Sequence, residues 1–214
     1  MNWEYGSVMQ IDGNTVLEDD DEPEARQAGA ALWFTGLPGA GKSTVAGAVL
    51  DVLKTRGLDV VHLRMDDRRK HYTPRPIYTA KERVEAYRMF VDEAAELVRE
   101  GRVVLMDGSG SQLDMRRYAR SMIERFAEVH LRCGVTTAMK RESARPEGAV
   151  MAGLYAKAMK RKATGQKFEG LGQVIGVDVP FEEDPRAELV LDSAGLSVEA
   201  MRDAVLERFA PWLG

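Results

Sequence analysis

The stretch "LWFTGLPGAGKSTVAGAVL", residues 32–50, constrains the fold of this chain more than any other. An apolar run ends at Thr35, glycines occupy positions 36, 39 and 41, and an apolar pattern with helical spacing follows Ser43. This order predicts a buried strand, a tight loop whose backbone needs the freedom of glycine, and a helix. A strand that leads directly into a helix is typical of the first unit of a parallel sheet wrapped by helices.

Residues 36–43 also match the phosphate-loop pattern G-x-x-x-x-G-K-[ST] in its required context between strand and helix. Glycines let successive N–H groups turn toward phosphate oxygens, and the positive end of the helix adds to the attraction. Lys42 is expected to reach the β- and γ-phosphates, and the Ser43 hydroxyl to ligate Mg²⁺. We therefore predict ATP and Mg²⁺ as cofactors, bound by Gly36, Gly39, Ala40, Gly41, Lys42, Ser43 and Thr44.

Apolar runs and helical stretches alternate through the rest of the chain. The runs are "DVVHLRM", "RVVLMD", "EVHLRC" and "AELVLDS". With the first strand they predict a five-stranded parallel sheet in a three-layer α/β/α P-loop NTPase fold, with a helical lid near residues 141–170. Thr79 and Glu82 form a capping-box pattern, and Gly101 follows as a stop signal. Further helices are expected from Ser111 through Phe126 and from Ser197 to about Ala210.

The net charge of −4 is unevenly distributed. Residues 1–26 hold eight acids and one arginine, so this part carries −7 and the rest of the chain +3. We interpret residues 1–29 as an acidic extension, either a small hairpin or disordered, and residues 30–214 as one domain. The chain has neither a secretory leader pattern nor an apolar run long enough for a membrane span, which predicts a cytoplasmic protein without a membrane partner.

Positive charge is concentrated in two segments of the domain. Residues 64–88 hold eight Lys or Arg against four acids, and residues 139–162 hold seven against two. Two basic segments favour a small anionic substrate, although solvated helix faces would give the same pattern. No aromatic interleaving or recognised motif points to nucleic acid, so no nucleic-acid partner is expected.

Four further stretches, together with the phosphate loop, carry a resemblance to a known family. They are "LRMDDRRK", "ERVEAYR", "GLYAKA" and "GVDVPFEEDPRAEL". Over roughly Leu32 to Ser193 the chain resembles the adenylyl-sulfate kinases, which phosphorylate the 3′-hydroxyl of adenosine 5′-phosphosulfate (APS) in sulfate activation. Four positions depart from the family pattern, one of them Gly110, which stands where the family has Ser. Arg64 stands where the family has Asp, Ala86 where it has Asn, and Val174 where a Phe would stack on adenine.

The resemblance implies roles for particular residues. Asp66 would orient or deprotonate the acceptor hydroxyl, with a turn leaving the strand as the alternative interpretation of Asp66 and Asp67. Arg69, Arg83, Arg88 and the lid residue Lys157 would bind the anionic substrate. Phe168 is a candidate replacement for the missing aromatic ring.

Strand ends and helical spacing add three more residues. Asp107 follows a strand at the place of a Walker-B carboxylate that holds magnesium through water, although an Asp that opens a Gly-Ser turn would look the same. Arg141 and Arg145, one helical turn apart, could close over ATP as part of the lid.

The sequence leaves two other functions open. One is a related small-molecule or nucleotide kinase with a different acceptor, and the other is a non-catalytic nucleotide switch that serves a protein partner. A homodimer is also conceivable, because Trp3 and Trp212 near the termini could meet each other or a partner subunit.

Overall fold

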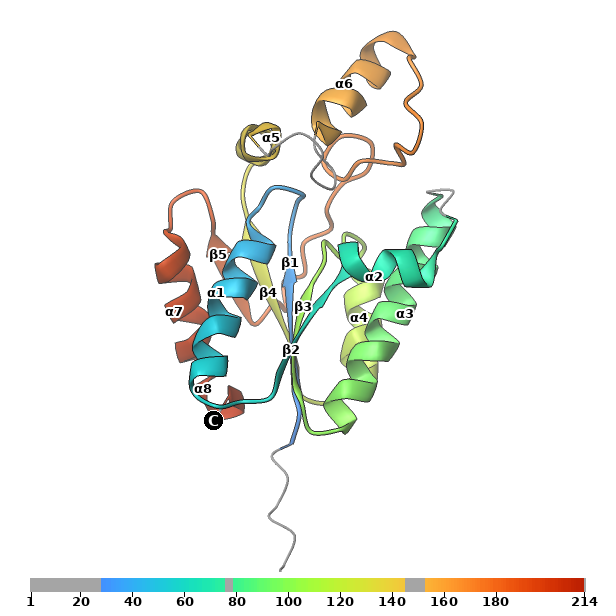
Figure 1. The fold of residues 1–214 in the computed structure, drawn as a ribbon. Coiled ribbons are helices and arrows are strands. Elements are labelled where there is room, and N and C mark those ends of the chain that lie inside the picture. Colours follow the sequence, from blue (N-terminus) through green and yellow to red (C-terminus); the bar gives the residue numbers. More distant parts are fainter. Residues whose placement is uncertain (1–27, 76–78, 145–152, 214) are drawn as a thin grey trace, which may run out of the picture.

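The computed structural model describes residues 28–75, 79–144 and 153–213. These residues contain a five-stranded sheet with the order β2-β3-β1-β4-β5, in which all paired strands are parallel (Figure 1). The sheet confirms the predicted fold class. In chain order the strands are Ala30–Thr35 (β1), Val60–Arg64 (β2), Val103–Asp107 (β3), Phe126–Arg132 (β4) and Leu189–Asp192 (β5).

Helices cover both faces of the sheet, which gives the three predicted layers (Figure 1). α1 and α7 pack together on one face, and α3 and α4 on the other. The helices span Lys42–Thr55 (α1), Met65–Tyr72 (α2), Ala80–Arg99 (α3), Leu113–Met122 (α4), Val135–Ser143 (α5), Leu154–Thr164 (α6), Val198–Arg208 (α7) and Ala210–Leu213 (α8). α5 and α6 lie beyond the carboxyl ends of the strands, where the sequence predicts a lid (Figure 1).

The central strand β1 is buried along its whole length. Leu32 and Phe34 belong to the core on the α1 side, whereas Trp33 belongs to the core on the α3 side with Tyr87 and Phe90. Strands covered on both faces are read as continuous apolar runs rather than as alternating patterns. For this reason, the apolar run before the phosphate loop predicts a strand.

Two of the expected helix starts are confirmed by their caps. The Thr79 hydroxyl accepts a hydrogen bond from the Glu82 N–H at 3.2 Å, and the Ser197 hydroxyl accepts one from the Ala200 N–H at 3.1 Å. Such a cap satisfies an N–H group that has no partner inside the helix. α3 then ends at Arg99, two residues before Gly101.

Two details of the predicted elements are wrong. The helix after residue 111 ends at Met122, and Phe126 begins β4 instead of closing the helix. The Phe126 ring packs edge-on against the Trp33 ring, with their centroids 6.3 Å apart. Burial of Phe126 in the core thus outweighs the helical pattern of the sequence. In addition, β2 leads directly into α2, which places Asp66 and Asp67 in the first turn of a helix rather than in a loop.

Candidate active site

The phosphate loop connects β1 to α1 and is shaped by glycine. Gly36, Gly39 and Gly41 have φ angles of 132°, 87° and 98°, a region that favours glycine. A Cβ added to Gly36 would lie 2.4 Å from the Leu131 carbonyl oxygen, and one added to Gly39 would lie 2.4 Å from that of Ala138. The loop can follow this path only without side chains at these positions.

Lys42 is the first residue of α1, so it lies where the loop meets the positive end of the helix. Its Nζ donates to the carbonyl oxygens of Leu37 at 2.9 Å and Gly36 at 3.2 Å. These bonds fold the ammonium group back over the loop. A helix N-terminus with free N–H groups and an adjacent ammonium is suited to bind a phosphate chain.

Asp107 ends β3 beside this loop and has only 6% of its side chain exposed. Burial raises the pKa of this carboxyl, but the neighbouring polar side chains of His62 and Ser43 and the charge of Lys42 outweigh that effect, so the pKa lies below its ordinary value. Arg64 Nε lies 3.7 Å from Asp107 Oδ2. The group is therefore a carboxylate at neutral pH.

Ser43 and Asp107 bring two oxygen ligands together, which suits Mg²⁺. Within the described ranges, no group of three or more His, Cys, Asp or Glu side chains forms a metal cluster. Mg²⁺ keeps several waters and takes few protein ligands beside substrate phosphates. The arrangement supports the predicted magnesium roles of Ser43 and Asp107.

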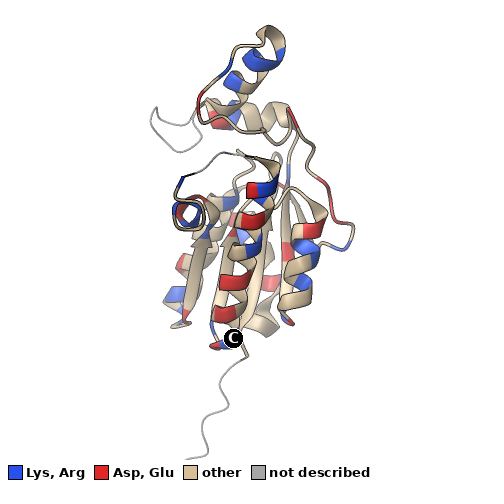
Figure 2. Ribbon diagram, turned by 90° about the vertical axis from the view of Figure 1, so that its right-hand side faces the viewer, with Lys and Arg blue, Asp and Glu red and all other residues tan. Residues whose placement is uncertain are grey.

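A cavity of about 500 Å³ opens from the phosphate loop toward α2, α3 and the segment after α6. Its charged lining comprises five cations, Lys42, Arg69, Lys70, Arg83 and Lys157, and three acids, Asp66, Asp107 and Glu169. The excess of positive charge favours an anionic ligand. The lid helix α6, at the top of the view in Figure 2, carries several Lys and Arg positions (blue) and contributes Lys157 to this cavity.

Asp66 lies in the first turn of α2, at the carboxyl end of β2, and lines the same cavity as Lys42. In open parallel sheets, ligands bind in the crevice at this end of the strands. The cavity therefore contains a phosphate-binding group and a potential proton acceptor. Half of the predicted site residues line this cavity: Gly39, Lys42, Ser43, Asp66, Arg69, Arg83, Asp107 and Lys157.

Arg88 does not belong to this lining. Its guanidinium lies over the Tyr118 ring, 5.4 Å from the centroid, on the side of α3 that faces α4. Five residues separate Arg88 from Arg83, and at 3.6 residues per turn they point about 140° apart around the helix. The predicted substrate contact of Arg88 is therefore corrected to a contact between helices.

Phe168 is also absent from the cavity lining. In this part of the chain, the lining begins at the next residue, Glu169. The Leu171 N–H donates to the Phe168 carbonyl at 3.2 Å, so Phe168 opens a turn that precedes the cavity wall. Val174, with 1% exposure, lines the cavity itself. The predicted aromatic replacement is therefore not in place in this structure.

Arg141, on α5, does not line this cavity but contacts the phosphate loop. Its guanidinium donates to the Ser193 carbonyl at 2.6 Å, to the Ser193 hydroxyl at 3.3 Å and to the Ala40 carbonyl at 3.5 Å. The lid helix α6 is tied to the same loop, because the Tyr155 hydroxyl donates to the Pro38 carbonyl at 2.9 Å. Arg145 lies outside the described residues.

Sequence reasoning missed several residues of the cavity. Tyr87 belongs to the core on the α3 side and also lines the cavity, and burial raises the pKa of its hydroxyl. Lys70 was noticed only as part of a basic segment. The consecutive residues 169–175 form one wall, and neither periodicity nor charge marks them in the sequence.

The phosphate loop, the adjacent carboxylate and the cationic cavity define a P-loop kinase. The model of the family described as adenylylsulphate kinase matches residues 28–192, and the chain belongs to this family. It is a phosphotransferase that uses ATP and Mg²⁺ and phosphorylates a hydroxyl group.

Individual relatives agree with this assignment. A protein of Archaeoglobus fulgidus named "Probable adenylyl-sulfate kinase" is 33% identical over 162 residues, which is 76% of this chain and 94% of that protein. The adenylyl-sulfate kinase of Phocaeicola vulgatus is 29% identical over 213 residues, with 99% and 97% covered.

Among solved structures, the APS kinase of Mycobacterium tuberculosis in complex with AMPPNP and APS has a TM-score of 0.71. Its identity to this chain is 24%, and the match covers 86% of this chain and 98% of that one. This comparison shows that the two proteins share a fold. Among the described residues, no helix is long and apolar enough to cross a membrane.

Proposed function

We propose that the acceptor is APS and that the product is its 3′-phosphate, formed in sulfate activation. One observation carries the proposal: Arg69 and Arg83 line the same cavity as Lys42 and Asp66. A small molecule whose anionic group lies against the two arginines can thus place a hydroxyl between the phosphate loop and Asp66. The family membership and the Phocaeicola vulgatus relative support APS as this molecule.

In the proposed reaction, the phosphate loop and Lys42 hold the β- and γ-phosphates of ATP. The acceptor hydroxyl oxygen attacks the γ-phosphorus, the bond from that phosphorus to the oxygen shared with the β-phosphate breaks, and ADP leaves. The hydroxyl proton passes to the Asp66 carboxylate. Bound Mg²⁺, held by Ser43 and Asp107, would supply positive charge for the phosphate oxygens.

The roles of the arginines follow from their positions. Arg69 and Arg83 orient the acceptor through its phosphosulfate, and Lys157 brings a third cation from the lid helix. Arg141 contacts Ala40 and Ser193, so it acts on the side of the nucleotide. Holding both molecules in one orientation supplies much of the acceleration in phosphoryl transfer, since the protein has little covalent chemistry to perform.

A related kinase with another anionic acceptor is the second candidate. It is favoured by Val174, a small side chain in the cavity where an aromatic ring would stack on adenine. Base stacking on an aromatic ring is worth about 1–3 kcal/mol on the scale of nucleic-acid contacts. A non-catalytic switch is disfavoured, because it would not need Asp66, Arg69 and Arg83 in one cavity.

The test is acceptor-dependent turnover. The purified protein is incubated with ATP and Mg²⁺, with APS or with adenosine 5′-monophosphate, and the products are identified by phosphorus NMR. ADP and a new 3′-phosphate should form with APS and not with the monophosphate. Equal turnover of both, or ADP release that is independent of any acceptor, would reject APS as the substrate.

The cytoplasmic location and the homodimer remain predictions. The centroids of the Trp212 and Phe209 rings are 5.7 Å apart, and the Arg125 guanidinium lies over the Trp212 ring. Trp212 therefore has partners within its own chain. Trp3 lies outside the described residues. Light scattering of the protein as it elutes from a size-exclusion column would give its mass in solution. A mass equal to that of one chain would reject the dimer.

A further inference from the structure

The wall of the acceptor cavity opposite α2 and α3 is formed by residues 169–175, here called the wall segment. It belongs to a stretch between α6 and β5 in which the structure contains one isolated β-bridge, Ile175 to Val179, and no helix or strand. Backbone carbonyl and N–H groups in such a stretch need partners outside regular structure. In the wall segment, side chains from other elements provide several of them.

Arg161, in the last turn of the lid helix α6, is the principal donor. Its guanidinium donates to the Leu171 carbonyl at 2.8 Å, to the Gly172 carbonyl at 3.0 Å and to Asp178 Oδ2 at 2.6 Å. The planar guanidinium fork can serve several acceptors at fixed angles, which a lysine ammonium does not reproduce. Arg161 itself does not belong to the described lining of the cavity.

Asp178 completes the arrangement from the other end of the turn. The oxygen that accepts from Arg161 also accepts from the Val174 N–H at 2.6 Å. The Asp178 N–H in turn donates to the Val174 carbonyl at 2.8 Å. One carboxylate thus joins the lid helix to the residue whose side chain lines the cavity.

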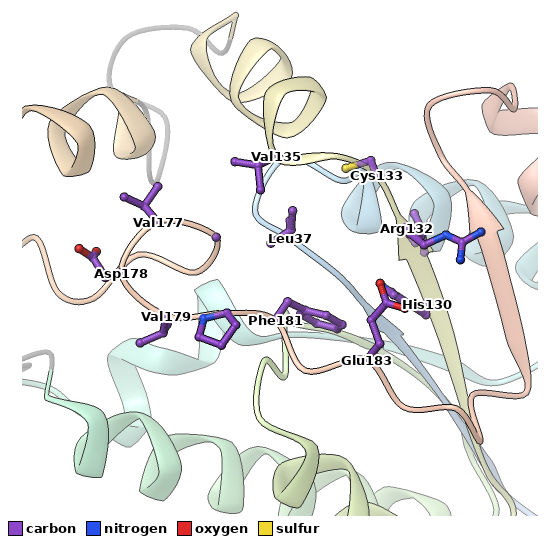
Figure 3. Close-up of a pocket in the computed structure, with 13 residues that line it drawn as sticks. Leu37, His130, Arg132, Cys133, Val135, Val177, Asp178, Val179, Phe181 and Glu183 are labelled. Carbon is purple, nitrogen blue, oxygen red and sulfur yellow. The ribbon is translucent and has the colours of Figure 1, made fainter. Parts of the chain in front are cut away.

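The turn is packed on one side and borders a cavity on the other. A second cavity, of about 410 Å³, lies on the side of residues 176–181 that faces β4 (Figure 3). Figure 3 shows Val177, Asp178 and Val179 on one loop, with His130 and Arg132 of β4 across the cavity. Val177, Val179 and Phe181 still pack against the core that contains Val174 and Ile175, so the hydrogen bonds of Arg161 and Asp178 act together with this packing.

The arrangement also affects the polarity of the cavity. Carbonyl oxygens carry partial negative charge and would repel an anionic acceptor if they faced it. The Leu171 and Gly172 carbonyls are instead directed to the Arg161 guanidinium. The wall segment can then face the acceptor without adding negative charge from these two groups.

We propose that Arg161 and Asp178 are positioning residues that set the shape and polarity of the acceptor wall, and so control acceptor affinity without touching the acceptor. The inference extends the proposed function, because APS is the acceptor used to test it. It also assigns Arg161, which lies in the basic segment 139–162, to the acceptor side.

The experiment compares Asp178→Asn and Arg161→Lys with two matched controls. Glu183→Gln removes an exposed carboxylate from the same stretch, and Lys160→Ala changes an exposed side chain on the same helix. KM for APS, KM for ATP and kcat are measured for each protein. Each test variant should raise KM for APS about tenfold, the scale of one charged hydrogen bond, and leave KM for ATP within about twofold.

A second readout does not depend on turnover. Amide hydrogen exchange of the Val174 N–H should be faster in Asp178→Asn than in the unaltered protein, and unchanged in Glu183→Gln. In the double variant Arg161→Lys/Asp178→Asn, KM for APS should be about the same as in the single variant with the larger increase, because both changes break the same hydrogen-bonded unit.

Two outcomes would overturn the inference: a KM for APS that moves no more than in the controls, or equal increases in KM for APS and for ATP. If the unaltered protein does not turn over APS at all, the proposed function fails instead. The positioning pair is then judged by exchange, and an unchanged rate at Val174 in Asp178→Asn would refute it.

Discussion

The phosphate loop owes its conformation mainly to residues of its own motif, with added bonds from Arg141 and Tyr155. The wall segment 169–175 has no such motif and is bonded by side chains of other elements. In the loop, glycine conformations and the Lys42 bonds to Gly36 and Leu37 are local. In the wall segment, the donors are Arg161 and Arg83, the latter to the Gln173 carbonyl. The conformation of the nucleotide side is therefore determined mainly by a local sequence motif, and that of the acceptor side by contacts between elements.

The difference has a functional consequence. A loop specified by its own residues can stay constant while the other wall changes, so one phosphate-binding device can serve different acceptors. Substitutions in the loop should abolish the reaction with any acceptor. Substitutions around the wall segment should alter affinity for the acceptor and preserve that for ATP.

The largest effect is expected for Lys42→Ala. Without the ammonium group, charge on the transferring phosphoryl is no longer stabilised, and kcat/KM should fall by about a thousandfold or more. Turnover of APS measures this. Lys54→Ala, an exposed lysine near the end of the same helix, should leave the rate unchanged within about twofold. Substantial activity in Lys42→Ala would break the assignment of the loop.

Arg116→Leu should give the largest loss of stability. Arg116 is fully buried, pairs with buried Glu128 at 2.9 Å and donates to the carbonyls of Gly110 and Glu182. Removing one partner of a buried ion pair leaves an uncompensated charge, so the free energy of unfolding should fall by about 3–5 kcal/mol. Urea denaturation measures it, with exposed Arg117→Ala as the control. A loss below about 1 kcal/mol would show that the pair is not needed.

Asp66→Asn tests the proton acceptor. The amide keeps the shape of the side chain but cannot take the hydroxyl proton, so kcat should fall about a hundredfold while ATP affinity is retained. Rapid-quench kinetics and a separate ATP titration measure the two quantities. Asp67→Asn, the neighbouring exposed residue, is the control. A full rate in Asp66→Asn would remove this residue from the mechanism.

Arg83→Lys and Arg141→Lys separate the two sides of the site. The first should raise KM for APS about tenfold, and the second should raise KM for ATP by a similar factor, because a lysine cannot replace a guanidinium fork. Steady-state titration of each substrate gives both values. If each variant affected both substrates equally, the two sides would not be independent.

The smallest effect is expected for Arg88→Ala. Since Arg88 lies over Tyr118 on α4, KM for APS should change by less than about twofold. The same titration measures it beside Arg83→Lys. An increase as large as that of the Arg83 variant would restore the acceptor role that the family resemblance implies for Arg88.

The contrast between loop and wall also explains how far the sequence could be interpreted. The strand, the phosphate loop and α1 were predictable because each depends on neighbouring residues. Asp66 and Asp107 could be placed, since strands end where their apolar runs end. The five-stranded sheet followed from the alternation of strands and helices.

Other features depend on contacts that the sequence does not display. Residues 169–175 have no periodicity, and their path follows from Arg161 and Asp178, which the sequence does not connect. Arg88 matches a family position, but its direction is set by the packing of α3 on α4. Phe126 closes an apparent helical pattern, yet it is buried against Trp33 as the start of β4.

The most direct test is a crystal structure of the protein with AMPPNP, Mg²⁺ and APS. The account predicts the analogue's phosphates on the amides of residues 36–44, the APS phosphosulfate on Arg69 and Arg83, and its 3′-hydroxyl within hydrogen-bond distance of Asp66. APS bound outside this cavity, or a triphosphate that does not contact the loop, would contradict it.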